Sequence, residues 1–192
     1  GEVVRHITEA TKGNAIMVTD VGQQQMISSR YFKFNHSRSC VTSGGLGTMG
    51  FGLPASVGAQ IGRPDKTVIA FLGDGGFQMT LQELGTIANN NLPIKIVILN
   101  NNFLGMVRQW QQLFFDKRYS FTEMNNPDFV KIADAYAIAG KRVTKREELT
   151  ETVQAMLDHQ GPYLLEVVVG KEDNVFPMVP AGSSVSDVLL EP

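Results

Sequence analysis

The sequence contains a single cysteine, Cys40, and carries a net charge of only −2 over 192 residues. One cysteine rules out an internal disulfide and is typical of proteins kept in a reducing compartment, so we expect a cytoplasmic protein. The small net charge provides no general attraction to nucleic acid or to an acidic membrane. Polar residues interrupt every apolar run well before the ~20 residues that a membrane span requires. We therefore expect neither nucleic acid nor a membrane among its partners.

The chain also lacks internal repeats, low-complexity linkers and an apolar segment near its start. Residues 1–14 have the pattern of an amphipathic helix and not that of a signal peptide. The apolar content of 43% is ordinary for a globular domain, and 192 residues are enough to bury a full core. We expect residues 1–192 to form a single domain that belongs to a longer chain.

Short apolar runs alternate with helical patterns along the whole sequence. Strands that are apolar throughout and alternate with helices are typical of a parallel sheet covered on both faces. We therefore predict a three-layer α/β fold with a mostly parallel sheet flanked by helices. The predicted strands are residues 15–20, 39–42, 67–72, 94–100, 139–143 and 163–169, and the predicted helices are residues 23–29, 50–61, 81–90, 104–114, 126–137 and 146–159. The helix at 126–137 is expected to begin with Asn126 as its cap and Pro127 at its first position.

Polar residues follow several of these strands at their carboxyl ends, where ligands bind in open α/β sheets. Asp20 ends the first strand, Asp74 lies in a Gly-Asp-Gly turn after the strand at 67–72, and Asn100-Asn101 closes the next strand. Asp74 and Asn101 are 101 − 74 = 27 positions apart, which leaves room for one helix and one strand. Neighbouring parallel strands would then bring both side chains to the same edge. One carboxylate with neutral oxygens suits Mg²⁺ shared with a phosphate, which backbone N–H groups of the following helices could cradle.

Gly-Asp-Gly followed at this separation by Asn-Asn resembles the cofactor motif of thiamine-diphosphate enzymes. Further segments are similar to acetolactate synthases (acetohydroxyacid synthases) in particular, so that the resemblance extends over nearly the whole chain. These segments are residues 20–23, 42–55, 99–110 and 174–182. The chain thus resembles the C-terminal, thiamine-diphosphate-binding domain of the catalytic large subunit of that family, and the N-terminal pyrimidine domain and middle FAD domain of such an enzyme lie outside it.

The resemblance implies a role for each matching residue. Mg²⁺ would be held by the side chains of Asp74 and Asn101 and by the main-chain carbonyl of Phe103. The Gly47 carbonyl would accept a hydrogen bond from the aminopyrimidine, and Met49 would wedge between the two rings of the cofactor, where an unbranched thioether fits well. The full cofactor-binding set implied by the family is Gln23, Gln24, Gly47, Thr48, Met49, Asp74, Gly75, Gly76, Asn101, Phe103, Leu104, Gly105 and Met106.

Two positions depart from the family pattern, and one helix face extends the site. The family usually has histidine where this chain has Gln24, and it often has serine where this chain has Gly76. A neutral amide would therefore replace a histidine–phosphate contact, and a hydroxyl contact is lost. Met106 and Trp110 are four residues apart and share one face of a predicted helix. The resemblance implies that this face lines the substrate channel, with Trp110 as the place where flat inhibitors stack.

The resemblance also implies the reaction. The full-length transferase would decarboxylate pyruvate and transfer the two-carbon unit to a second 2-oxo acid, pyruvate or 2-oxobutyrate, in branched-chain amino-acid biosynthesis. It would need thiamine diphosphate and Mg²⁺, with FAD bound only in the full-length enzyme. The catalytic glutamate would come from a second catalytic subunit in a homodimer or larger assembly, with a small regulatory subunit as an optional partner. We expect no catalytic residue in this chain and no synthase activity from it alone, because Glu83, Glu123 and Glu166 lie outside the required motif; we expect Glu123 and Glu166 to be peripheral.

Other interpretations stay open at this point. Residues 45–50 match G-x-G-x-x-G, a pattern of dinucleotide-binding folds, although the preceding segment is too short and polar for the usual strand. Met49, and the face shared by Met106 and Trp110, would also suit ordinary core packing. The alternatives to an acetolactate synthase are a glyoxylate carboligase, pyruvate oxidase or benzoylformate decarboxylase of the same fold, and a cofactor-binding remnant without catalysis. Residues expected to lie on the surface without a ligand are His6, His36, His159, Lys141, Arg142, Lys145 and Arg146.

Overall fold

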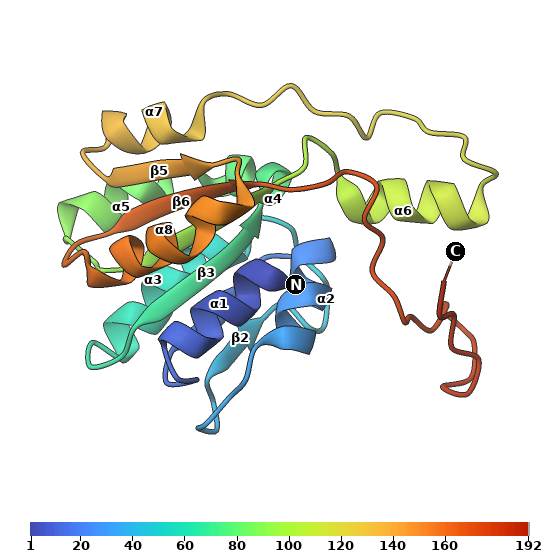
Figure 1. Cartoon of the computed structure of the whole chain (residues 1–192), viewed down its shortest axis with the longest axis horizontal. Coiled ribbons are helices and arrows are strands. Elements are labelled where there is room, and N and C mark those ends of the chain that lie inside the picture. The colour runs from blue at the N-terminus through green and yellow to red at the C-terminus, as the bar shows by residue number, and fades with distance from the viewer. Residues whose placement is uncertain (192) are drawn as a thin grey trace.

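A parallel sheet of six strands forms the centre of the molecule (Figure 1). The computed structural model describes residues 1–191. The strands are β1 (Ile16–Thr19), β2 (Cys40–Thr42), β3 (Val68–Gly73), β4 (Lys95–Asn100), β5 (Ala139–Val143) and β6 (Tyr163–Val168). Their spatial order is β2-β1-β3-β4-β6-β5, and each neighbouring pair is parallel. This confirms the predicted sheet, including all six predicted strands.

Helices cover both faces of this sheet. The helices are α1 (Glu2–Ala10), α2 (Gln23–Tyr31), α3 (Gly52–Gly62), α4 (Asp74–Thr80), α5 (Glu83–Asn89), α6 (Gly105–Phe114), α7 (Phe129–Ala135) and α8 (Leu149–Asp158), the last preceded by a 3₁₀ turn, η1 (Arg146–Glu148). Apolar side chains of α3, α4, α5 and α7 pack on one face, and those of α1, α2 and α8 pack on the other. The fold is thus the predicted three-layer α/β arrangement.

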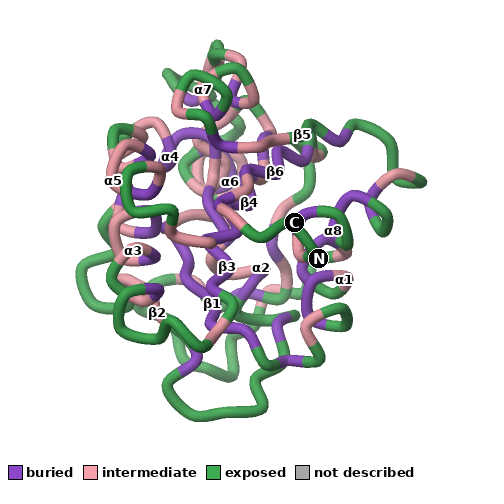
Figure 2. Tube along the Cα trace, turned by 90° about the vertical axis from the view of Figure 1, so that its left-hand side faces the viewer, coloured by how far each residue is buried: buried purple, intermediate pink, exposed green. Residues whose placement is uncertain are grey.

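The central strands are apolar throughout because both of their faces are buried. In β3, Ala70 and Leu72 belong to one core cluster and Ile69 and Phe71 to the other, and all four are 0% exposed. Alternate residues of a strand point to opposite faces, so a two-sided core requires this unbroken apolar run. Figure 2 shows the strands as a buried centre inside more exposed helices and loops.

Two details of the helices differ from the prediction. Asp74 does not end in a turn but begins α4, a helix that the glycines of residues 73–76 concealed because glycine has low helix propensity. Burial of Phe77 against Phe129, with ring centroids 5.4 Å apart, stabilises α4 from the core. The cap of α7 is Asp128, whose carboxylate accepts from the backbone N–H groups of Val130 and Lys131. The prediction that Asn126 caps this helix is wrong, and its side chain has another role, described below.

The segment after β6 leaves the sheet and runs past α6, at the carboxyl edge of the strands (Figure 1). Gln109, on the buried face of α6, bonds both backbone groups of Val175: its Oε1 accepts from the N–H at 3.0 Å and its Nε2 donates to the carbonyl at 3.3 Å. Arg30 of α2 donates to the carbonyls of Phe176 and Pro177. These contacts hold the segment beside the edge where the strands end. Within residues 1–191, every helix is too short or too polar to cross a membrane.

Candidate functional site

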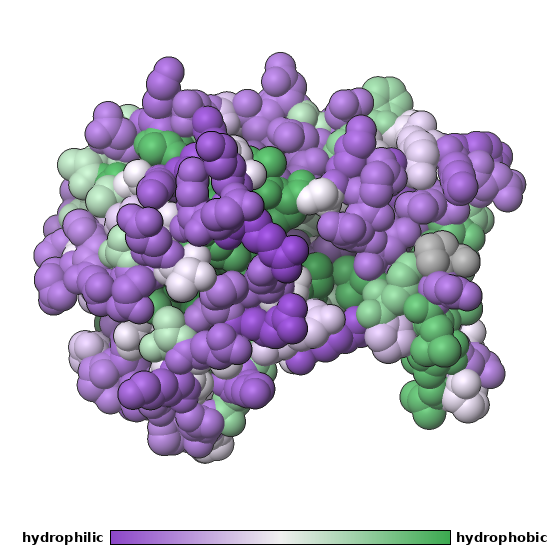
Figure 3. All heavy atoms as spheres, in the orientation of Figure 1, coloured by the Kyte–Doolittle hydropathy of each residue, from purple (hydrophilic) through white to green (hydrophobic). Residues whose placement is uncertain are grey.

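A cavity of about 410 Å³ opens at the carboxyl edge of the sheet, between the strand ends, α6 and the segment after β6. This volume is within the ~300–1,000 Å³ typical of small-molecule sites. Figure 3 shows the surface hollowed here, with hydrophobic residues inside the hollow. The residues of the sequence-derived set that line the cavity are Gln23, Gln24, Met49, Asp74, Gly75, Gly76, Asn101, Phe103, Leu104, Gly105 and Met106. The chain therefore brings most of the expected cofactor-binding residues to one place.

Asp74 and Asn101 meet at this edge because their strands are adjacent. β3 and β4 pair with Gly73 opposite Leu99, so the residues that follow each strand lie side by side. Asp74 is 2% exposed, and its carboxylate accepts from the Gly75 N–H at 3.1 Å and from Asn126 Nδ2 at 2.7 Å. Within residues 1–191 no lysine, arginine or histidine forms an ion pair with it.

The environment of Asp74 suits a bound cation. Burial raises the pKa of its carboxyl group, because a desolvated carboxylate without a positive partner is costly. A divalent cation in the adjoining cavity would compensate for this cost. Across the described residues no group of three His, Cys, Asp or Glu side chains could hold a metal. A cation here would depend on one carboxylate plus amide and main-chain oxygens, a combination that Mg²⁺ accepts.

The loop after β4 is shaped by its own side chains. Asn101 Oδ1 accepts from the Phe103 N–H at 3.0 Å, and the Leu104 N–H donates to the Thr122 carbonyl at 2.8 Å. Asn102 has φ +58°, a left-handed conformation that asparagine tolerates better than most residues. These bonds fix the turn that presents Asn101 and Phe103 to the cavity. Their role as metal ligands stays a prediction.

Glycines around the cavity allow its walls to pack closely against one another. A Cβ at Gly75 would lie 2.8 Å from Leu104 Cδ2, and a Cβ at Gly105 would collide with Gln23 and lie 2.8 Å from Asn101 Nδ2. Asn101 Nδ2 donates to Gln23 Oε1 at 3.5 Å, and Gln23 Nε2 donates to Gln109 Oε1 at 2.8 Å. Without Cβ atoms at these two positions, Leu104 packs directly on the first turn of α4, and Gln23 and Asn101 pack on the start of α6. The expected diphosphate contacts of Gly75 and Gly76 stay a prediction.

Gln24, the residue at the family's histidine position, is buried at the cavity wall. Its Nε2 donates to the Val21 carbonyl at 3.0 Å, and its amide lies against Gly22 and Gly73. This amide therefore supports the turn between β1 and α2 in addition to lining the cavity.

Three residues of the expected set do not line the cavity. Gly47 and Thr48 lie on an exposed loop, and Trp110 is half-buried on α6, where it packs on Phe114 with ring centroids 4.8 Å apart. Met106 does line the cavity, and neither it nor Trp110 is fully buried, so this face of α6 is not ordinary core. The roles proposed for Gly47, Thr48 and Trp110 stay predictions.

Asp20, which ends the first strand, has a structural role. It is 0% exposed, and its carboxylate accepts from the N–H groups of Val21, Gly50 and Gly52 at 2.8–3.1 Å. It thereby ties the loop that carries Met49 to the sheet edge.

A second group of polar residues behind the cavity is not among the residues predicted from the sequence. Glu166 is not peripheral: it is 1% exposed on β6 and bonds Asn100 and Arg142. Arg142 is correspondingly not a purely solvated residue, since it pairs with Glu166 and Asp128. Asn126 contacts Asp74 directly. The sequence feature that indicates this group is the glutamate inside the apolar run at 163–169, because a carboxylate in a buried strand requires a partner.

Comparisons with known proteins agree with this geometry. Residues 20–167 match the sequence family described as "Thiamine pyrophosphate enzyme, C-terminal TPP binding domain". The chain is 46% identical over 188 residues to the acetolactate synthase isozyme 2 large subunit of Escherichia coli. The aligned region covers 97% of this chain and 34% of that protein. It is 46% identical to acetolactate synthase 1, chloroplastic, of Nicotiana tabacum, over 98% of this chain and 29% of that protein. It is 44% identical to the acetolactate synthase large subunit of Lactococcus lactis, over 94% of this chain and 32% of that protein. The chain thus spans about a third of the length of these curated relatives.

Proposed function

Because the chain belongs to the thiamine pyrophosphate (thiamine diphosphate) enzymes, as their C-terminal cofactor-binding domain, we propose that it forms the diphosphate-and-metal half of an acetolactate synthase active site. The observation that carries the proposal is the buried Asp74 carboxylate, which has no cationic partner among the described residues and lines one cavity with Asn101. The acetolactate synthase names of the relatives support the choice of reaction.

The chain's own residues would bind and orient the cofactor. Asp74, Asn101 and the Phe103 carbonyl would hold Mg²⁺, and the wall around Gly75 would receive the diphosphate. Met49, on the loop tied down by Asp20, would support the bent cofactor from another side of the cavity. When bound, thiamine diphosphate supplies a nucleophilic carbon that adds to the carbonyl of a 2-oxo acid, while the protein positions the reactants and excludes water.

The remaining parts of the proposal concern the whole enzyme. Pyruvate would be the donor, with pyruvate or 2-oxobutyrate as the acceptor, in branched-chain amino-acid biosynthesis. A second catalytic subunit would supply the glutamate that acts on the pyrimidine, and FAD would bind outside this chain. A regulatory subunit and a cytoplasmic location also stay predictions. Since the catalytic glutamate lies elsewhere, the 192-residue chain alone is expected to be inactive.

The full-length protein that contains this chain provides the test. Incubated with pyruvate, Mg²⁺ and thiamine diphosphate, it should form 2-acetolactate, and removal of either Mg²⁺ or the cofactor should stop the reaction. Release of acetaldehyde or acetate without carbon–carbon bond formation would indicate another enzyme of the same fold. Failure to bind thiamine diphosphate by calorimetry would overturn the proposal and favour a remnant without catalysis.

A further inference from the structure

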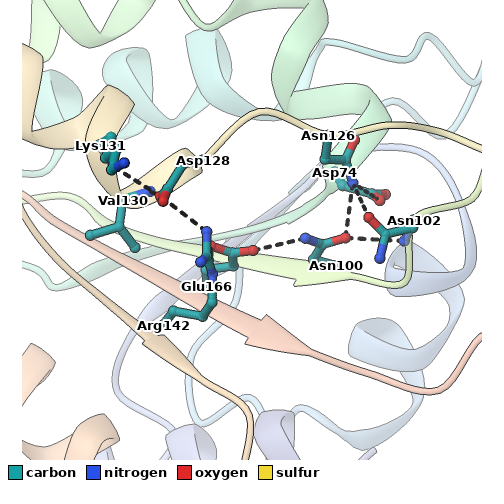
Figure 4. Close-up of polar contacts among 9 residues, drawn as sticks. All are labelled: Asp74, Asn100, Asn102, Asn126, Asp128, Val130, Lys131, Arg142 and Glu166. Atoms are coloured by element: carbon teal, nitrogen blue, oxygen red, sulfur yellow. Dashed lines mark hydrogen bonds and ion pairs between the residues drawn. The ribbon is translucent and has the colours of Figure 1, made fainter.

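A continuous chain of hydrogen-bonded side chains runs from the protein surface to Asp74 along one face of the sheet (Figure 4). Its centre is Glu166, whose side chain is 2% exposed. Glu166 pairs in register with Arg142 of β5 and with Ile98 of β4, so the Arg142 and Asn100 side chains lie on its face. Glu166 Oε2 accepts from Arg142 Nε at 2.7 Å, and Glu166 Oε1 accepts from Asn100 Nδ2 at 2.8 Å.

The series of hydrogen bonds continues from Asn100 to the cavity. Asn100 Oδ1 accepts from Asn126 Nδ2 at 2.9 Å and from the Asn102 N–H at 3.0 Å, inside the loop that carries Asn101 and Phe103. Asn126 Nδ2 in turn donates to Asp74 Oδ2 at 2.7 Å. Asn100 thus connects Glu166 to both halves of the expected metal site, the Asp74 carboxylate and the loop after β4.

The chemistry of the two ends determines the direction of every bond between them. An ionised carboxylate only accepts hydrogen bonds, so the Asn100 group that faces Glu166 must be its NH₂. Its oxygen then faces Asn126, which must present its own NH₂ and can therefore donate to Asp74. The Asn126 oxygen is left for Gln78 Nε2, which donates to it at 2.9 Å. Arg142, which also pairs with Asp128 at 3.0 Å, donates to the other oxygen of Glu166 from the surface side.

From this geometry we infer that Glu166, supported by Arg142, is a positioning residue for the metal-and-diphosphate site. It acts through the Asn100 and Asn126 amides to fix Asp74 and the 101–103 loop in the arrangement that receives the cation. The inference rests on the proposed function, since it concerns the same cation. It adds a residue on β6 and a residue on β5, neither of which belongs to the Gly-Asp-Gly or Asn-Asn motif.

Glu166→Gln tests the donor–acceptor direction of these hydrogen bonds with little change in the shape of the side chain. A glutamine at this position presents an NH₂ group to either Arg142 or Asn100, both of which are donors. Because the bond to the charged arginine is the stronger of the two, the amide oxygen should face Arg142. Asn100 must then turn over, which places its NH₂ against Asn126. In the full-length protein we expect the Mg²⁺ concentration for half-maximal thiamine-diphosphate binding, measured by calorimetry, to rise about tenfold. Glu151→Gln, at an exposed glutamate of α8, is the matched control and should leave it unchanged.

A double-variant cycle separates positioning from a merely structural role. Asn126→Ala, at a half-buried loop residue, should raise the same Mg²⁺ requirement, and the double variant should be little worse than the more affected single variant, because both act through one chain. Additive effects, or an unchanged Mg²⁺ requirement in either single variant, would overturn the inference. Thermal unfolding of the cofactor-free variants monitors the fold, and Asn126→Ala keeps the test available if Glu166→Gln folds poorly. If the unmodified protein itself fails to bind the cofactor with Mg²⁺, the proposed function is at fault and not the positioning role.

Discussion

The carboxylate of Asp20 occupies the space that a side chain at Gly76 would need. Asp20 cannot easily move aside, because the N–H groups of Val21, Gly50 and Gly52 hold its two oxygens and the residue is fully buried. The first turn of α4 therefore packs directly on the carboxylate that anchors the loop carrying Met49. A small residue at position 76 is required for two walls of the cavity to meet.

Replacement of Gly76 should show this contact as a loss of stability. Gly76→Ala should lower the free energy of unfolding by about 1–3 kcal/mol, the usual cost of overpacking a rigid site. Gly76→Ser should cost less, since its hydroxyl can donate to the Asp20 carboxylate. Gly58→Ala in α3 is the control, because a Cβ there meets no neighbour within 4 Å and should be neutral or stabilising. Urea unfolding of the four proteins measures these differences, and equal stability of Gly76→Ala and Gly58→Ala would contradict the packing argument.

Asp74→Ala should abolish Mg²⁺-dependent binding of thiamine diphosphate in the full-length protein. The substitution removes the only carboxylate in the expected ligand set and leaves the amide and carbonyl oxygens without a charge to attract the cation. Calorimetric titration with the cofactor, at several Mg²⁺ concentrations, measures the effect. Affinity equal to that of the unmodified protein would exclude Asp74 as a ligand. Unchanged thermal unfolding of the cofactor-free variant would show that the loss is local.

The sheet and the meeting of Asp74 with Asn101 were predictable from local pattern alone. Apolar runs at 67–72 and 94–100, separated by a helical segment, predict consecutive strands of a parallel sheet, and parallel strands end at the same edge. The structure shows that these two strands, β3 and β4, are neighbours. A polar residue placed directly after each strand must then reach that edge. The order of the other strands does not follow in this way, since β6 and not β5 lies beside β4.

The residues behind the site could not be deduced in the same way. Asn126 before Pro127 has the pattern of a helix cap, yet the cap is Asp128, and only the folded chain brings Asn126 against Asp74. Likewise, Glu166 is interpretable only once β5 and β4 are known to flank β6. These partners lie 24 to 66 residues apart, and no strand-end pattern of the kind that brings Asp74 and Asn101 together marks them in the sequence.

Asp128 should contribute to stability mainly as the cap of α7. Asp128→Ala removes the acceptor for the Val130 and Lys131 N–H groups and should lower the melting temperature by about 2–4 °C. Asp128→Ser keeps a capping oxygen but removes the pair with Arg142, so it should recover most of this loss. Differential scanning calorimetry distinguishes the two variants. If both variants melt at the same reduced temperature, the ion pair and not the cap is the main contribution.

Lys95 gives the stability of the protein a specific dependence on pH. The residue is 3% exposed at the start of β4, and its Nζ donates to the carbonyls of His159 and Gly161 at 2.6 and 2.8 Å. Burial lowers the pKa of Lys95 to about 8, because the charged ammonium group is desolvated. In the unfolded chain the same group keeps its proton up to the ordinary lysine pKa of ~10.4.

Between about pH 8 and 10 the unfolded state therefore binds more protons at Lys95 than the folded state does, so this group makes folding more favourable as pH rises. Below pH 8 both states are protonated and the contribution is constant. We expect the stability of the unmodified protein, relative to Lys95→Met, to be flat from pH 6.5 to 7.5 and to increase from pH 8 to 9.5. Urea unfolding at each pH measures the difference, and other titrating groups cancel because both proteins contain them. Lys33→Met, at an exposed lysine, controls for the loss of a lysine as such. A relative stability that does not rise over pH 8 to 9.5 would show that the two carbonyls favour the charged ammonium at least as much as burial opposes it.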